Sequence, residues 1–250
     1  MPMDLGLNGR TVVVTGGTGA LGRAVVARLL AEGARPVVTW RSERELRDFP
    51  AGDRVRLEKL DLADESAVDG FYRGLGGPGG LWASVHLAGG FNMATVENTT
   101  AADFLGMFAT NTLSCFLCSR EAVRAMCAGG GAGSGAGAGN GKGSRAGGRI
   151  VNVAARPALV PTGGMIAYST SKAAVASLTQ CLAEEVKPDG IWVNAVAPSI
   201  MDTPANRAAM PNVDYTTWPK VEQVAETIVY LASPGNTLTT GAIVPVYGKA

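Results

Sequence analysis

The chain has 250 residues, and its 22 lysines and arginines nearly balance its 21 aspartates and glutamates, for a formal net charge of +1. This balance argues against a nucleic-acid or membrane-surface partner, and no apolar run reaches the ~18 residues of a membrane span. A single histidine, His86, argues against a multi-histidine metal site, so no metal is expected. The first residues, MPMDLGLNGR, lack a basic segment followed by an apolar one, which favours a cytoplasmic protein.

Short runs rich in valine and isoleucine alternate with helical patterns along the chain. We predict strands at 11–15, 36–40, 54–60, 82–88, 149–154, 191–197 and 242–248. We predict helices at 20–33, 42–48, 63–75, 101–127, 165–186 and 221–233. The strands are continuous apolar runs, which is typical of parallel strands covered on both faces. The sequence therefore predicts one α/β domain over 1–250, a doubly wound Rossmann fold with a mostly seven-stranded parallel sheet flanked by helices.

The segment 128–148 interrupts this alternation, because 11 of its 21 residues are glycine. It cannot bury enough apolar surface to offset the entropy of ordering, so we predict a flexible surface insertion. A nucleotide-binding glycine loop is the alternative, but no strand precedes the segment and no helix follows it. It joins a helix to the start of a strand, which places it at the edge of the sheet opposite to the usual ligand edge.

A second glycine-rich stretch, TGGTGALG at 15–22, follows the first strand and opens the first helix. In this context glycines let the backbone turn tightly and approach a pyrophosphate, which the free N–H groups of the helix start can bind. A turn without a ligand is the alternative. The residues expected to contact a dinucleotide here are Gly16, Thr18, Gly19, Leu21 and Gly22.

The end of the second strand indicates which dinucleotide binds. Arg41 and Ser42 stand where an acidic residue would bind the ribose 2′-hydroxyl and repel a 2′-phosphate. A cation and hydroxyl donors favour that phosphate, so NADP(H) is the favoured cofactor and NAD(H) remains possible. Arg41 as a solvated charge is the alternative. Asp61, next to Leu62 after the third strand, is placed to accept from the adenine amino group or to cap the following helix.

Tyr168 and Lys172 are four residues apart and share a helix face. An ammonium beside a phenol favours the tyrosinate, so Lys172 is expected to lower the pKa of Tyr168 from ~10 toward neutral pH. Such a phenol can exchange a proton with a substrate. An ordinary pair on the surface of a helix is the alternative.

These motifs together resemble the short-chain dehydrogenase/reductase family, over essentially all of the chain outside 128–148. The residues that carry the resemblance are Thr15–Gly22, Asp61-Leu62, Ala88-Gly89-Gly90, Asn111, Tyr168, Lys172, and Asn194–Pro198 through Thr203. The resemblance implies that Tyr168 gives a proton to the substrate as hydride leaves the nicotinamide. It also implies that Lys172 holds the nicotinamide ribose and that Asn111 positions a water beside it. Further cofactor contacts are implied for Ala88, Gly89, Gly90, Pro198, Ile200 and Thr203.

The chain departs from the family pattern at three places. The glycines follow TGxxGxxG rather than TGxxxGxG, and Ser199 replaces the glycine after Pro198. Ala155 stands where the family has a catalytic serine, thirteen residues before Tyr168. One branch, the dihydropteridine reductases, also has alanine there and resembles this chain over 200–218. Its quinonoid substrate has less need of an oxyanion donor, although Arg41 departs from the acidic residue of that branch.

We therefore expect an NADP(H)-dependent oxidoreductase acting on a small carbonyl or quinonoid/imine substrate, with Tyr168 as the proton donor. A dihydropteridine reductase proper and a non-catalytic dinucleotide-binding sensor are the alternatives. The loop 199–218 is expected to cover the substrate with an apolar wall of Met201, Pro204, Met210 and Trp218. Packing of these residues on the core is the alternative. The resemblance also implies a homo-oligomer, a dimer or tetramer, that pairs the helices at 101–127 and 165–186.

Overall fold

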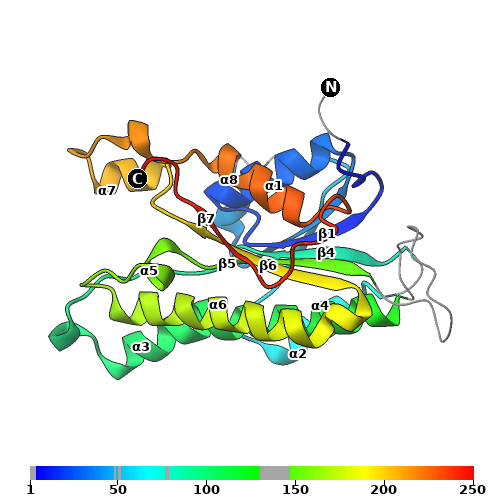
Figure 1. The fold of residues 1–250 in the computed structure, drawn as a ribbon, viewed down its shortest axis with the longest axis horizontal. Helices are drawn as coiled ribbons and strands as arrows, with labels where there is room; N and C mark the ends of the chain where they lie inside the picture. The colour runs from blue at the N-terminus through cyan, green and yellow to red at the C-terminus, as the bar shows by residue number, and fades with distance from the viewer. Residues whose placement is uncertain (1–3, 48, 50–51, 77–78, 130–146) are drawn as a thin grey trace.

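The computed structural model describes residues 4–47, 49, 52–76, 79–129 and 147–250. Seven parallel strands form one sheet in the order β3-β2-β1-β4-β5-β6-β7 (Figure 1). The strands are β1 (Thr11–Thr15), β2 (Arg35–Trp40), β3 (Arg56–Lys59), β4 (Leu81–His86), β5 (Gly148–Val153), β6 (Ile191–Pro198) and β7 (Ile243–Val246). The predicted fold class is thereby confirmed. Strand order reverses between β1 and β4, which is where ligands bind at the carboxyl edge of such sheets.

Helices cover both faces of the sheet, with α1 and α8 on one face and α2, α4 and α6 on the other (Figure 1). The α-helices are α1 (Ala20–Ala31), α2 (Glu65–Arg73), α3 (Ala101–Met107), α4 (Ser114–Ala128), α5 (Arg156–Leu159), α6 (Ile166–Val186), α7 (Pro204–Ala209) and α8 (Val221–Leu231). Successive strand side chains point to opposite faces. Val12 and Val14 therefore pack in the core under α1 and α8, and Val13 packs in the core on the other side. This explains why the strands read as continuous apolar runs.

The structure divides the helix predicted at 101–127 into three pieces. Between α3 and α4 lies η3 (Phe108–Leu113), a π-helical segment that the apolar pattern gave no sign of. The helix predicted at 42–48 is a single 3-10 turn, η1 (Glu43–Leu46), held by a capping box between Ser42 and Glu45. The other 3-10 turns are η2 (Val96–Asn98), η4 (Lys187–Asp189) and η5 (Tyr215–Thr217).

The glycine-rich segment 128–148 begins in α4, where Ala128 is the last helical residue, and ends in β5, where Gly148 is the first. Residues 130–146 lie outside the described residues, so the predicted flexibility stays a prediction. The flanking helix Ala101–Ala128 is long and apolar enough to cross a membrane by length and composition, contrary to our expectation from the sequence. It packs on α2, α6 and β4 and carries Asn111, while only 28% of its most apolar window is buried.

A buried chain of hydrogen-bonded polar side chains links the sheet to α2 and to α6, the helix that carries Tyr168 and Lys172. The Oγ of Ser84 lies 2.8 Å from the hydroxyl of Tyr72 and 2.8 Å from Nε2 of His86. Nδ1 of His86 lies 2.8 Å from Oδ1 of Asn152, whose amide donates to Thr179 on α6 at 2.9 Å. Buried polar groups of this kind hold neighbouring elements in one arrangement when all of them are paired. This series of hydrogen bonds therefore holds α6 against β4 and β5.

Candidate active site

Three glycines shape the turn between β1 and α1, each for its own reason. Gly16 has a φ of +65°, and a Cβ there would lie 2.7 Å from the backbone nitrogen of Ala88. A Cβ on Gly22 would overlap the carbonyl oxygen of Gly16, so glycine lets α1 start against the turn. By contrast, the nearest atom to a Cβ on Gly19 would be 3.5 Å away. Gly19 immediately precedes α1, so its open side leaves room for a phosphate at the free N–H groups.

A cavity of about 420 Å³ lies beside this turn, at the carboxyl ends of β1 to β4. Its lining contains eight residues expected to bind a dinucleotide: Gly16, Thr18, Gly19, Arg41, Asp61, Leu62, Ala88 and Gly89. Leu21 is instead buried in the core under α1, and Ser42 is engaged in the capping box of η1. The cavity joins helix-start amides, an arginine and an apolar leucine, which fits the phosphates and adenosine of a dinucleotide.

Glu45 is an acidic residue of this cavity that the sequence reasoning missed. Its carboxylate accepts from the backbone N–H groups of Arg41 and Ser42 at 3.3 and 3.1 Å. It also accepts from the hydroxyl of Thr18 at 3.2 Å. The spacing of Ser42 and Glu45 is that of a capping box, which was the available signal. A negative charge therefore lies in the same cavity as Arg41, where a 2′-phosphate would bind.

Asp61 does not cap the following helix. The N-cap of α2 is Asp64, whose side chain accepts from the backbone N–H of Ala67 at 3.0 Å. Asp61 accepts from the backbone N–H of Ala63 at 3.0 Å and lines the cavity with Leu62. The capping alternative for Asp61 is therefore wrong. Its contact with adenine stays a prediction, and Asp61 lines the cavity in which that contact would form.

Asn111 lies in the π-helical segment η3 and connects the loop after β4 to α6. Its amide oxygen accepts from Gly90 N–H at 2.8 Å, and its amide nitrogen donates to the Gly90 carbonyl at 3.2 Å and to Ser171 Oγ at 3.0 Å. A Cβ on Gly89 would lie 2.6 Å from Oδ1 of Asn111 and 3.3 Å from Nζ of Lys172. Only glycine therefore fits between these two side chains. Short π-helical segments frequently occur at functional sites.

Lys172 and Tyr168 project from α6 into this region. Nζ of Lys172 donates to the carbonyl of Val153 at 2.8 Å, and burial lowers the Lys172 pKa to about 8. Burial raises the pKa of Tyr168 to about 12. The expectation that Lys172 lowers the Tyr168 pKa is wrong for the chain alone, because desolvation dominates and the ammonium is directed at Val153. The phenol is thus protonated at neutral pH and able to donate.

Among the described residues, neither Ser169 nor Ser171 takes the place of the serine that Ala155 replaces. Ala155 is buried and is separated from the end of β5 by Ala154. The hydroxyl of Ser171 donates to the Tyr168 carbonyl at 2.8 Å and accepts from Asn111. Ser169 Oγ is buried with no hydrogen-bond partner in the described part of the chain. It lines a groove beside α5 and η2 that does not include Tyr168, as the 100° step of a helix requires.

The loop after β6 places the remaining predicted cofactor residues at the same edge. Pro198 ends β6, Ile200 is half-buried, and the side chain of Thr203 caps α7 by accepting from Asn206 N–H at 3.2 Å. Met201 packs against the core under α1 and α8, and Trp218 is also buried. The predicted apolar wall over the substrate is therefore not formed by these two side chains.

Phe91 and Arg156 are two neighbours of the site that the sequence reasoning missed. The ring of Phe91 meets the ring of Tyr168 edge-on, with 4.9 Å between centroids. Arg156 directly follows Ala155 and opens α5. Only their positions in the sequence could have indicated them, because Phe91 directly follows Ala88-Gly89-Gly90 and Arg156 directly follows Ala155.

Comparison with known proteins decides the family. A sequence profile described as short chain dehydrogenase matches residues 10–214. The chain belongs to this family. Galactitol 2-dehydrogenase of Rhizobium johnstonii is 35% identical to this dehydrogenase over 259 residues, which cover 96% of this chain and 94% of the relative. Cis-4-hydroxycyclohexanecarboxylate dehydrogenase of Sinomonas cyclohexanicum is 34% identical over 258 residues, covering 96% and 95%.

Solved structures agree with this assignment. A dehydrogenase/reductase from Sinorhizobium meliloti 1021 superposes on this short-chain dehydrogenase with a TM-score of 0.79 at 30% identity, over 98% of this chain and 96% of that chain. The protein is therefore an oxidoreductase of a family that uses NAD(P), and the non-catalytic sensor is not favoured. The relatives named here give no support to a pterin substrate.

Proposed function

We propose that this dehydrogenase uses NADP(H) to reduce a small carbonyl or quinonoid/imine substrate, with Tyr168 as the proton donor. The observation that carries the proposal is the position of Gly89, which lines the dinucleotide cavity and fits between Asn111 and Lys172. The dinucleotide supplies the hydride when bound. The cofactor cavity and the candidate proton-transfer residues therefore meet at one residue.

The chain's own residues supply the proton chemistry. Tyr168 holds its proton at neutral pH and can give it to the substrate atom that becomes negative. Lys172, held by the Val153 carbonyl, brings a positive charge to the same helix face. Asn111 is hydrogen-bonded to the Gly90 backbone and to Ser171, so it links the loop after β4 to the first turns of α6.

The preference for NADP(H) rests on Arg41. Arg41 lines the dinucleotide cavity directly after β2, and no acidic residue stands at the strand end itself. Glu45 opposes this preference because its carboxylate lies in the same cavity. Glu45 is already engaged by two backbone N–H groups and Thr18, which reduces its hold on a ribose hydroxyl. We therefore propose that Arg41 determines the cofactor preference and that NAD(H) is bound more weakly than NADP(H).

We expect the enzyme to reduce a carbonyl group of the substrate to a hydroxyl group, or an imine-type bond to its reduced form. Two relatives carry names that contain hydroxylated compounds, galactitol and a hydroxycyclohexanecarboxylate. These names support the carbonyl over the quinonoid substrate. Ala155 removes one donor for a developing oxyanion, so the carbonyl must be oriented by other contacts.

We also propose that the protein is a cytoplasmic homo-oligomer, a dimer or tetramer. Apolar side chains on α3, η3 and α4 remain exposed, with Leu105 at 66%, Leu113 at 43% and Phe116 at 40%. Phe116 and Leu113 supply surface that a partner helix would cover. The cysteines in the described residues are all free, which fits a reducing compartment.

The test is oxidation of NADPH and NADH with a panel of ketones, quinones and quinonoid dihydropterin. We expect turnover with NADPH, and a fall of about 10²–10⁴-fold in kcat for Tyr168→Phe with NADPH binding retained. Tyr230→Phe is the matched control, because Tyr230 is a partly exposed tyrosine on α8. NADPH binding without turnover of any compound would contradict the proposal, as would full activity in Tyr168→Phe.

A further inference from the structure

Arg156 is a cation at the carboxyl edge of the sheet that no carboxylate neutralises in the described part of the chain. Its guanidinium lies over the ring of Tyr247, with 5.2 Å from Cζ to the ring centroid. It is half-buried and takes part in none of the ion pairs or hydrogen bonds of the described residues. The charge is met by an aromatic ring and water rather than by a carboxylate, so the N–H groups of Arg156 are available to an anionic ligand.

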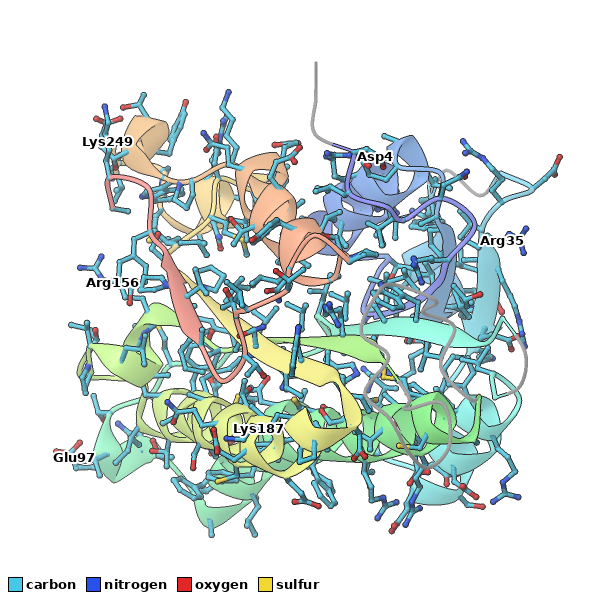
Figure 2. All side chains as sticks on the ribbon, turned by 45° about the vertical axis from the view of Figure 1, so that its right-hand side comes forward. Asp4, Arg35, Glu97, Arg156, Lys187 and Lys249 are labelled. Atoms are coloured by element: carbon cyan, nitrogen blue, oxygen red, sulfur yellow. The ribbon has the colours of Figure 1, made fainter. Side chains whose placement is uncertain are left out.

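The surroundings of Arg156 place it on the substrate side of the site. Tyr247 directly follows β7, and its carbonyl accepts from the hydroxyl of Ser199, just after β6, at 2.8 Å. Arg156 itself follows β5 after two alanines, and α5 packs on α6, the helix of Tyr168. Figure 2 shows Arg156 beside β7, far from Arg35 at the opposite end of the molecule. The cation therefore stands where the loops after β5, β6 and β7 meet.

The side of the phenol nearest the loop after β4 is apolar. Phe91 is 60% exposed although its ring touches Tyr168, and Met93 is 58% exposed two residues later. The loop is fixed, because Ala94 N–H donates to the Gly164 carbonyl at 2.9 Å, just before α6. Exposed apolar side chains next to a reacting group are typical of a binding pocket. They suit a hydrocarbon skeleton better than a hydroxyl-rich one.

We infer that the substrate is an oxo acid: a small ketone with an apolar skeleton and a carboxylate that Arg156 binds. This inference rests on the proposed function. The skeleton packs on Phe91 and Met93 while Arg156 donates two N–H groups to the carboxylate. In reduction, hydride from the reduced dinucleotide adds to the carbonyl carbon and Tyr168 gives a proton to the oxygen, forming a hydroxy acid and oxidised dinucleotide. The carboxylate stays unchanged.

The same arrangement accounts for Ala155. A serine hydroxyl would orient the carbonyl directly, and this chain has none at that position. A carboxylate held at a fixed distance from the carbonyl fixes the direction of the carbonyl instead, since holding one end of a small molecule orients the other. Arg156, which directly follows Ala155, thus orients the substrate carbonyl by binding the carboxylate at the other end of the substrate.

The test compares 4-oxocyclohexanecarboxylate with its methyl ester, which keeps the ring and ketone and loses the charge. We expect kcat/KM for the acid to exceed that for the ester by about tenfold or more in the wild type. Arg156→Met should remove this preference through a higher KM for the acid, and Arg156→Lys should keep part of it. Arg35→Met is the matched control, because Arg35 is an exposed arginine at the start of β2. Phe91→Ala should raise KM for both compounds.

Several results would overturn the inference and leave the proposed function standing. Equal kcat/KM for acid and ester in the wild type is one, and this comparison holds even if Arg156→Met fails to fold. Faster reduction of a ketose such as fructose than of the acid is another, and an unchanged preference in Arg156→Met is a third. Absence of Tyr168-dependent turnover with every compound would instead remove the proposed function itself, and the inference with it.

Discussion

The two sides of the crevice make different demands on the chain. On the dinucleotide side, recognition depends on backbone: Gly16 and Gly22 are required by close backbone contacts, and Gly19 leaves open space at the start of α1. On the reacting side, the proposed groups are side chains from separate elements, with Asn111 on η3 and Lys172 on α6.

This difference explains why the dinucleotide side keeps glycines, although in the spacing TGxxGxxG, while the reacting side has lost a catalytic side chain. A backbone that must approach a phosphate closely leaves little choice of residue, because any Cβ would collide. A side chain that orients a substrate can be replaced by another that holds the same substrate elsewhere. Ala155 with Arg156 is such a replacement in our proposal.

Lys172→Met should have the largest effect, and it tests whether the reacting side can be impaired without changing the dinucleotide side. We expect kcat to fall about 10²–10⁴-fold, because the charge on the Tyr168 face is lost. Burial lowers the Lys172 pKa to about 8, so wild-type reduction should slow as pH rises through that value while the variant does not. Binding of 2′,5′-ADP, which occupies only the dinucleotide side, should be unchanged.

The control for this change is Lys187→Met, because Lys187 is exposed on η4 and paired with Glu184. The separation of the two sides would be contradicted if Lys172→Met weakened 2′,5′-ADP binding as much as it slowed turnover. Calorimetric titration supplies the affinity and steady-state assays supply kcat.

His86→Asn tests the buried hydrogen-bond chain that holds α6, the helix of Tyr168 and Lys172, on the sheet. Burial lowers the His86 pKa from 6.5 to about 4 in the folded chain. As pH falls from 6.5 toward 4, the unfolded chain takes up a proton that the folded chain does not, so stability is lost over this interval. Between pH 7 and 4.5 the wild type should lose about 2 kcal/mol more than His86→Asn. Urea unfolding at both pH values measures this, and equal losses would show that His86 is not buried neutral.

Arg41→Ala sharpens the account of the dinucleotide side. We expect KM for NADPH to rise about tenfold, because charged hydrogen bonds to the 2′-phosphate are lost, while KM for NADH changes little. Arg44→Ala on the same turn is the control, since Arg44 is exposed and outside the cavity lining. Parallel changes for both cofactors would show that Arg41 does not read the 2′-phosphate.

Glu45→Gln should have the smallest effect and the opposite sign. Glutamine can still accept from one of the backbone N–H groups that Glu45 binds, but it carries no charge. We expect KM for NADPH to fall by about three- to fivefold, a range typical of exposed charge pairs. A rise in KM would mean that the turn is held chiefly by the charge of Glu45. Kinetics with both cofactors, alongside the melting temperature, separate these outcomes.

The sheet was predictable because burial on both faces leaves a plain mark in the sequence. Val12, Val13 and Val14 read as one apolar run since each faces one of two covered sides. The helix interruption at η3 was not predictable, because α- and π-helical segments differ in hydrogen bonding and not in composition. The helix predicted at 42–48 is only a 3-10 turn at Glu43–Leu46, because the residues of so short a segment do not fix the length of the helical element.

The site was predictable where residues lie close in sequence and less so where elements converge. Tyr168 and Lys172 announce their shared face by spacing alone. The contacts of Phe91 with Tyr168 and of Arg156 with Tyr247 join segments separated by dozens of residues, which no local pattern records. Desolvation likewise depends on the whole fold, so the raised Tyr168 pKa could not be foreseen from the neighbouring ammonium.

The wide turn at Phe108–Leu113 has a consequence for how this chain tolerates length changes. It accommodates a surplus residue while the helices before and after it keep their faces toward the protein. Losing one residue, such as Ala109, would let ordinary winding resume and leave Leu117 and Cys118 packed as they are. Asn111, however, would swing off Gly90 and Ser171. We therefore expect a shortened protein to keep its fold and, under the proposed function, to lose its activity.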